Sequence, residues 1–191
     1  MSSDERRERL LDVARLLVVE DGVNVVTMGT VADGAGVTRA LVYKHFENKH
    51  DLLLSLYRRE AKRLDRMMSD AVLEAGPEFV VKLRTLIDLV IDSADENGTF
   101  FNLLRNVSND PAARSDRRNW DRRTVRYFAR LAAEEYELDE AVAKAAVAGL
   151  LPGVLTVRSR VIAGPAEREF LTDVYLAMVE SGLRSLSGFP R

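Results

Sequence analysis

The chain has 191 residues, a formal net charge of −2, 47% hydrophobic residues and no cysteine. This length is enough for a small domain joined to a larger one, and the composition is typical of a globular protein. The lack of cysteine excludes disulfides and thiolate chemistry. No apolar run is expected to approach the ~20 residues that span a bilayer, and the charged N-terminus is unlike a signal peptide. We therefore expect a cytoplasmic protein with no membrane partner.

Hydrophobic residues recur at helical spacing from end to end, strand signals are scarce, and Gly, Pro, Asn and Asp mark the breaks. The sequence predicts an all-α fold of about nine helices. These are a first helix that ends at Asp21-Gly22, two short helices within 27–46, and helices over about 48–70, 77–94, 100–109, 111–136, 139–163 and 165–187. Pro152-Gly153 interrupts the helix over 139–163.

The helix over 77–94 carries charged residues beyond its apolar face. Arg84 and Asp88 are four residues apart, which predicts an ion pair along the helix. With Asp92, they are expected to lie on the solvated surface.

The sequence offers little material for catalysis. Its two histidines, His45 and His50, lie in one basic segment, without the cysteines or ordered carboxylates that would complete a metal site. There is no Gly-rich phosphate loop and no nucleophile-elbow pattern. We therefore expect no enzyme activity, no metal and no cofactor.

The segment from Thr27 to Phe46 has the pattern of two short helices joined by a tight turn. Thr27 and Thr38 are each placed to cap a helix by accepting a hydrogen bond from its first turn. Gly36 can take the left-handed conformation that the turn requires, and Val42 and Phe46 would anchor the second helix on the core. This is the arrangement of a helix-turn-helix, whose second helix enters the major groove of DNA.

Residues 4–64, with this motif at 27–46, resemble the DNA-binding domain of the TetR (tetracycline-repressor) family. The resemblance rests on residues at fixed spacing, namely Gly22, Thr27, Val31-Ala32, Ala35-Gly36-Val37-Thr38, Val42-Tyr43-Lys44-His45-Phe46, Lys49 and Leu52-Leu53. It implies that the bases are faced by Arg39, Ala40 and Leu41. It implies that the phosphate backbone is held by Thr27, Thr38, Tyr43, His45 and Lys49. Lys44 is assigned to either a base or a phosphate, and the fork of Arg39 suits guanine.

Two features of this segment depart from a strong DNA-binding pattern. Gly29 and Gly34 lie in the first motif helix, and each weakens a helix by roughly 1 kcal/mol relative to alanine. The first 50 residues are also not basic overall. A basic surface is expected only locally, because no acidic residue lies between Gly34 and Phe46.

The same resemblance assigns residues 65–191 to a regulatory domain that binds an unidentified small-molecule effector and forms a homodimer. Apolar and aromatic residues on two successive helices are the candidate pocket lining: Phe100, Phe101, Leu104, Trp120, Tyr127 and Phe128. Asn102, Arg105 and Asn106 would orient an apolar or amphipathic ligand. Small residues in 139–163 and an apolar stripe in 165–187 favour a homodimer through residues about 139–187.

We therefore expect a sequence-specific transcriptional regulator that binds double-stranded operator DNA. By the habit of the family, it would be a repressor that a ligand releases. Two other classes remain as alternatives, namely an all-helical enzyme or small-molecule carrier built on this scaffold, and a protein-interaction adaptor. The Arg-rich helix over 114–130 also has two interpretations. It is either a site for an anionic effector or for a second DNA contact, or a solvated face paired with acids such as Glu134.

Overall fold

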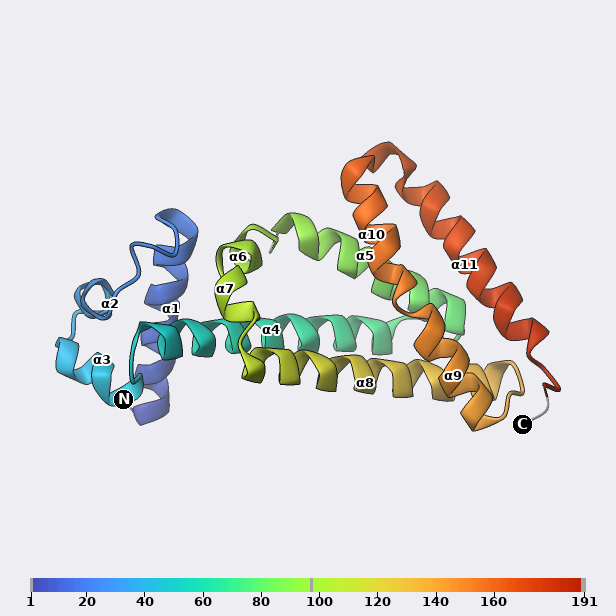
Figure 1. Ribbon diagram of the computed structural model, residues 1–191, viewed down its shortest axis with the longest axis horizontal. Helices are drawn as coiled ribbons and strands as arrows, with labels where there is room; N and C mark the ends of the chain where they lie inside the picture. The colour runs from blue at the N-terminus through green and yellow to red at the C-terminus, as the bar shows by residue number, and fades with distance from the viewer. Residues whose placement is uncertain (1, 97, 190–191) are drawn as a thin grey trace. The chain divides into compact units, whose positions relative to one another are not determined.

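The computed structural model describes residues 2–96 and 98–189, without the side chains of 94–96, 98, 99, 102, 105, 106 and 166. These residues form eleven α-helices, one 3-10 helix and no strand, so the all-α prediction is confirmed (Figure 1). The chain divides into two compact units. Unit 1 consists of Met1–Leu64 and Asn97–Arg117, and unit 2 consists of Asp65–Glu96 and Arg118–Arg191. The division into domains 4–64 and 65–191 stays a prediction.

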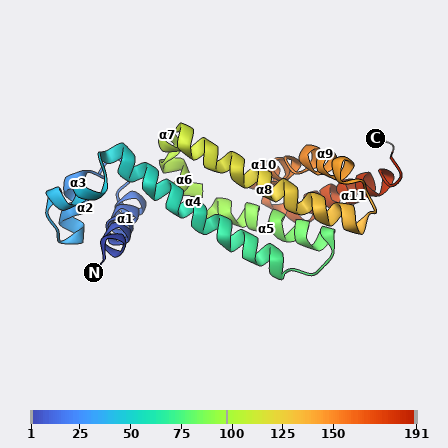
Figure 2. The same cartoon turned by 90° about the horizontal axis from the view of Figure 1, so that it is seen from below.

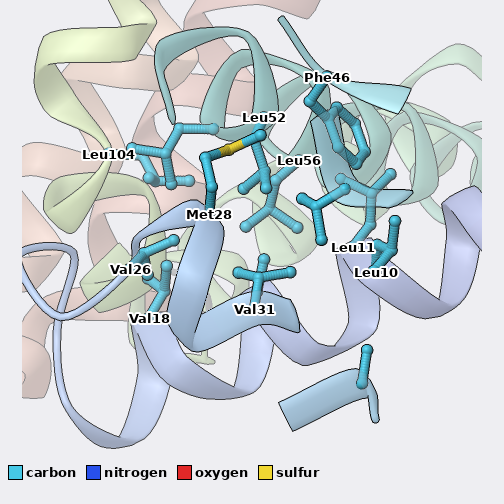
Figure 3. Close-up of a cluster of buried hydrophobic side chains, with 14 of the residues drawn as sticks. Leu10, Leu11, Val18, Val26, Met28, Val31, Phe46, Leu52, Leu56 and Leu104 are labelled. Carbon is cyan, nitrogen blue, oxygen red and sulfur yellow. The ribbon is translucent and has the colours of Figure 1, made fainter. Parts of the chain in front are cut away.

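Unit 1 is built on the first three helices and the start of a long fourth one, α1 (Ser3–Glu20), α2 (Met28–Ala35), α3 (Arg39–His45) and α4 (Lys49–Glu74). Helix α1 packs against α2, and α2 packs against α3. Figure 3 shows the side chains that converge between these helices, among them Leu11, Val31, Phe46 and Leu56. Each of these four is at most 1% exposed. Burying a side chain of this size contributes about 1.5–3 kcal/mol, so this cluster holds the short helices in place.

Two short helices from later in the chain complete unit 1, α6 (Gly98–Leu103) and α7 (Arg105–Ser108). Phe100, Leu104 and Val107 are buried in the same core as α1. The sequence predicts one helix here. The structure has two because Leu104, with φ −93° and ψ 20°, departs from helical geometry.

Unit 2 contains the end of α4 and most of α8. Its other helices are α5 (Phe79–Glu96), α8 (Pro111–Glu135), α9 (Glu140–Leu150), α10 (Gly153–Ala163), the 3-10 helix η1 (Pro165–Glu167) and α11 (Arg168–Ser185). Helix α5 packs against both α10 and α11, and α10 lies beside α11 (Figures 1 and 2).

The predicted interruption at Pro152-Gly153 separates α9 from α10. Together with the break at Leu104, it accounts for eleven helices where about nine are predicted. The interruption is supported by α11, because the Tyr175 hydroxyl donates a hydrogen bond to the Leu150 carbonyl at 2.6 Å. A Cβ on residue 153 would lie 2.5 Å from the Tyr175 ring, so only glycine fits there.

Charged residues of α5 pair with α11 and not along their own helix. Arg84 pairs with Asp173, while Arg168 donates to Asp88 at 2.9 Å and to Asp92 at 2.6 Å. The predicted pair between Arg84 and Asp88 is therefore wrong. Its spacing along α5 suits a pair, but the packing of α11 against α5 supplies other partners.

One stretch, Glu140–Ala163, is long and apolar enough to cross a membrane, with a mean hydropathy of 1.5. This corrects the expectation that no apolar run approaches that length. Only 22% of its most apolar window is buried.

Candidate functional site

Helix α2 begins and ends with local hydrogen bonds that fix the turn of the motif. Thr27 Oγ1 accepts from the Thr30 backbone N–H at 3.0 Å, and Thr30 Oγ1 accepts from the Thr27 N–H at 2.9 Å. At the other end Gly36 has φ 66° and ψ 38°, the left-handed conformation that glycine takes without strain. The Val37 N–H then bonds to the Ala32 carbonyl at 3.0 Å, which closes the turn.

Helix α3 is anchored by one face and leaves the other free. Its cap is Thr38, whose hydroxyl accepts from the Leu41 N–H at 3.4 Å. Val42 is fully buried. The residues of this helix that are expected to contact DNA all reach the solvent: Arg39, Ala40, Tyr43 and Lys44 are exposed, and Leu41 and His45 are half-buried. The free face therefore carries cationic and hydrogen-bonding side chains, and no acidic residue of α3 lies beside them.

The two glycines of α2 are each approached by another side chain. A Cβ on residue 29 would lie 2.7 Å from Nη2 of Arg39, so the Arg39 guanidinium rests against the start of α2. A Cβ on residue 34 would lie 2.7 Å from Cγ1 of Val13 on α1. Both glycines therefore have packing reasons that sequence reasoning did not find.

Lys49 lies at the start of α4 and holds the loop before the motif. Its Nζ donates to the carbonyls of Val23 at 3.0 Å and of Asn24 at 3.4 Å. An ammonium has three donors, so these bonds leave one for a phosphate. Asn48 caps the start of α4, since its Oδ1 accepts a hydrogen bond from the Asp51 N–H at 2.9 Å.

His50 is paired within unit 1. Its Nε2 lies 3.0 Å from Asp110 Oδ2. This hydrogen bond, with a second from the Ala112 N–H, holds the pKa of the Asp110 carboxyl below its usual value. His50 is therefore engaged with the cap of α8, whereas His45 remains on α3 with the residues expected to contact DNA.

Unit 2 contains a cavity of about 210 Å³ between α4, α5 and α8. Its walls are mostly apolar, with four polar residues among them. The lining comprises Asp65, Met68, Ser69, Val72, Leu73, Leu86, Trp120, Arg123, Thr124, Tyr127 and Phe128. A small cavity of this composition suits a compact organic molecule.

The structure divides the six residues expected to line one pocket. Trp120, Tyr127 and Phe128 line the cavity of unit 2, whereas Phe100, Phe101 and Leu104 belong to the core of unit 1. The rise of an α-helix places Phe128 about 25 Å along α8 from its start at Pro111, so residues on the two successive helices need not meet. The side chains of Asn102, Arg105 and Asn106 lie outside the described residues.

Sequence reasoning missed the walls from α4 and α5 and the polar pair in the cavity, Asp65 and Arg123, whose Oδ2 and Nη2 atoms lie 2.5 Å apart. The spacing of the arginines along α8 was an available signal, because two of them depart from the regular pattern. Five arginines of α8 recur every four residues and are exposed in the structure, namely Arg114, Arg118, Arg122, Arg126 and Arg130. Arg117 and Arg123 fall outside this spacing. Arg117 donates to the Tyr57 hydroxyl at 3.1 Å, so both turn to partners on α4.

Residues 10–56 match the sequence profile of bacterial regulatory proteins of the tetR family. This range contains the whole capped helix-turn-helix. Over these residues the chain is similar to the TetR family. The TetR resemblance inferred from the spacing of residues 22–53 is thereby confirmed.

Curated transcriptional regulators are also similar to part of this chain. The regulator AcrR of Shigella flexneri is 40% identical over 55 residues, which are 29% of this chain and 26% of AcrR. The activator FasR of Mycolicibacterium smegmatis is 29% identical over 53% of this chain and 46% of FasR. The repressor KstR of the same species is 35% identical over 39% of this chain and 37% of KstR. The chain thus matches less than half the length of each.

Solved structures extend the likeness to the whole fold. A TetR-like transcriptional regulator from Rhodococcus sp. RHA1 has a TM-score of 0.62 at 18% identity, with 93% of this chain and 95% of that one covered. The structure of SmeT in complex with triclosan has a TM-score of 0.55 at 21% identity, covering 93% and 91% of the two chains. At these identities the likeness concerns the fold alone, so the helices of this chain are arranged as in those structures.

Proposed function

We propose that the protein is a sequence-specific transcriptional regulator that binds double-stranded operator DNA through α3. The observation that carries the proposal is the free face of α3, which presents Arg39, Tyr43 and Lys44 on a capped helix-turn-helix with no acidic residue of α3 beside them. Cationic side chains on an exposed helix of this motif suit the major groove and its flanking phosphates.

Within this interface we assign different roles to Arg39 and Lys49. Arg39 begins α3, where side chains reach base edges, and its fork matches the acceptors of guanine. Lys49 begins α4, where the free N–H groups of the first turn and the ammonium favour a phosphate. The remaining assignments follow the family pattern, with Ala40 and Leu41 at bases and Thr27, Thr38, Tyr43 and His45 at the backbone.

The test is selection of bound genomic fragments, followed by affinity measurements on the selected operator. Arg39→Ala should cost about 1–3 kcal/mol and relax discrimination at one base pair. Lys49→Ala should weaken binding to all sequences alike and lower the salt slope by about one unit. Because Lys49 also holds Val23, thermal denaturation of that variant separates a loosened loop from a lost phosphate contact. A protein without any site preference would favour the carrier or adaptor alternatives.

We also propose that the regulator is a homodimer and acts in the cytoplasm. Exposed apolar side chains gather on α10 and α11, and we call this set the α10–α11 face: Leu155, Ile162, Phe170, Val174 and Met178. A second copy of the chain would cover this face and pair two α3 helices on a palindromic operator. The same pairing explains why the apolar stretch over 140–163 is mostly unburied.

Finally, we propose that a small molecule in the cavity of unit 2 controls DNA binding, with repression relieved by the ligand. The cavity and the triclosan complex of SmeT, a structural relative, support this. A ligand shifts DNA affinity only if it binds two conformations unequally. A reporter driven by the selected operator decides the mode, because FasR is named as an activator and KstR as a repressor.

A further inference from the structure

The cavity of unit 2 has a polar end that specifies the charge of its ligand. Building on the proposed function, we propose that it takes an organic cation, a compact aromatic or apolar body with an amidinium or amine that hydrogen-bonds to Asp65. The proposal names the chemical class of the effector and the residue that recognises it.

The cavity is polar at one end and apolar at the other. Asp65 on α4 and Arg123 on α8 lie together, as their ion pair requires. Val72, two turns further along α4, and Phe128 on α8 lie towards the apolar end with Leu86 of α5. An apolar cavity of about 150 Å³ accommodates benzene, so 210 Å³ has room for a single ring with a small polar substituent.

The Asp65 carboxylate is incompletely satisfied. Its Oδ2 lies 2.5 Å from Arg123 Nη2, while its Oδ1 is buried and has no hydrogen-bond partner among the described residues. A buried acceptor without a donor is costly. A planar cation with two parallel N–H groups would bond to both oxygens, as an arginine does in a bidentate pair.

The exposure of the two charged partners decides between a cationic and an anionic ligand. The Asp65 side chain is 19% exposed, whereas the Arg123 side chain is 62% exposed. A cation that replaces Arg123 keeps the Asp65 carboxylate paired, and the Arg123 side chain, which is already mostly exposed, is then solvated by water. An anion that bonds to Arg123 would leave Asp65 buried, unpaired and beside a like charge, which is strongly unfavourable.

The aromatic residues that line the cavity also favour a cationic ligand. Trp120, Tyr127 and Phe128 line the cavity, and the faces of aromatic rings attract cations. The Thr124 hydroxyl already donates to the Trp120 carbonyl at 3.1 Å. Among the described lining residues, Asp65 therefore offers the buried acceptor that still lacks a donor.

Three probes of one shape and different charge test the proposal in the full-length protein: benzamidine (cation), benzamide (neutral) and benzoate (anion). Trp120 is the single tryptophan of the chain and lines the cavity, so its fluorescence reports binding directly. We expect saturable quenching by benzamidine, at an affinity on the order of 10-fold or more above that of benzamide, and weaker binding still of benzoate. Equal or reversed affinities, or no saturable binding of benzamidine, would overturn the proposal.

Two variants assign the recognition to the polar pair. Asp65→Asn should weaken benzamidine binding about 10-fold or more, whereas Arg123→Gln should leave it equal or tighten it up to about fivefold. Asp70→Asn makes the same charge change at an exposed position of α4 and should leave it unchanged. If Asp65→Asn does not fold, the order of the three probes and Arg123→Gln still decide, since loss of benzamidine binding in Arg123→Gln would contradict the proposal. Operator binding is measured separately, so failure of the cavity proposal and failure of the DNA-binding proposal are distinguishable.

Discussion

Gly29 and Gly34 are the same residue type in one helix, yet different side chains approach them. The atoms near residue 29 belong to the end of Arg39, a long and flexible side chain, whereas the atom near residue 34 is Cγ1 of Val13. A β-branched side chain in a helix is held in one χ1 rotamer, so Val13 cannot turn away. Alanine at the two positions should therefore have opposite effects.

We predict that Gly29→Ala raises the free energy of unfolding by up to about 1 kcal/mol, because the helix gains propensity while Arg39 moves aside. Gly34→Ala should lower it by about 1 kcal/mol, because overpacking against Val13 exceeds the gain in propensity. Urea denaturation of both variants measures the difference. Gly34→Ala with Val13→Ala is the control and should recover part of the loss that the clash causes. Equal shifts in both single variants would contradict this account.

Tyr175 is a residue whose burial makes stability depend on pH. Burial raises the pKa of its hydroxyl to about 12, above the ordinary value of 10, so the folded state favours the protonated form. The stabilisation is complete below pH 10 and is lost as the pH rises towards 12. The stability difference between the parent and Tyr175→Phe should therefore shrink over that interval.

At neutral pH, Tyr175→Phe removes the hydrogen bond to the Leu150 carbonyl and should cost about 0.5–1.5 kcal/mol. Denaturation of both proteins between pH 8 and 12 gives the difference curve. Subtracting the two stability curves removes the contributions of groups that both proteins share. One such group is Tyr136, because burial also raises the pKa of its hydroxyl. A difference that stays constant from pH 8 to 12 would show that the Tyr175 hydroxyl does not carry the pH dependence.

At the scale of elements, the end of α4 depends on a cation from α5. Lys82 is 6% exposed, and its Nζ donates to the carbonyls of Val72, Leu73 and Ala75 at 2.8–3.2 Å. These carbonyls belong to the last turn of α4 and the residue after it, where a positive charge also stabilises the helix dipole.

Lys82→Met keeps most of the apolar stem but removes all three donors, so we predict a loss of about 1–3 kcal/mol in the free energy of unfolding. Lys82→Arg should lose less, because it keeps a cation with several donors. Thermal and urea denaturation provide the comparison. An unchanged stability in Lys82→Met would mean that water satisfies these carbonyls as well as the lysine does.

The elements that the sequence predicts are those whose signals are local. Thr27, Gly36 and Thr38 act within a few residues of their positions, so the caps and the turn of the motif follow from spacing. Lys82 and Arg84 depend on partners that packing brings near. Nothing in the spacing of α5 shows that Lys82 reaches the end of α4 or that Arg84 meets Asp173.

At the scale of the whole molecule, the candidate DNA-contacting face was predictable from the sequence. Only part of the cavity lining was. Arg39 and Lys44 lie on one short helix, and their exposure follows from the burial of Val42. The cavity is assembled from three helices, and its polar end joins Asp65 to Arg123 across 58 positions of the chain. Aromatic content identifies Trp120 and Phe128, but it does not show that Phe100 belongs to another core.

The assembly of two chains is the largest feature that the proposals require, and Met178 is the place to test it. Met178 is 67% exposed and lies on the α10–α11 face, one turn beyond Val174 on α11. If a second copy covers this face, Met178→Asp places an unpaired charge in an apolar interface, which is strongly unfavourable. We therefore predict that Met178→Asp yields a monomer of 21.4 kDa by light scattering, with the helical content of the parent.

Loss of the dimer should lower operator affinity by about 100-fold or more, because the two α3 helices no longer bind as a linked pair. Each chain would then meet its half-site independently, and the preference for palindromic DNA should disappear with the affinity. Met67→Asp is the matched control, since Met67 is 48% exposed on α4 and lies outside both the α10–α11 face and the cavity lining. It should remain dimeric and bind DNA normally. A Met178→Asp protein that stays dimeric and binds the operator like the parent would move the interface to another surface.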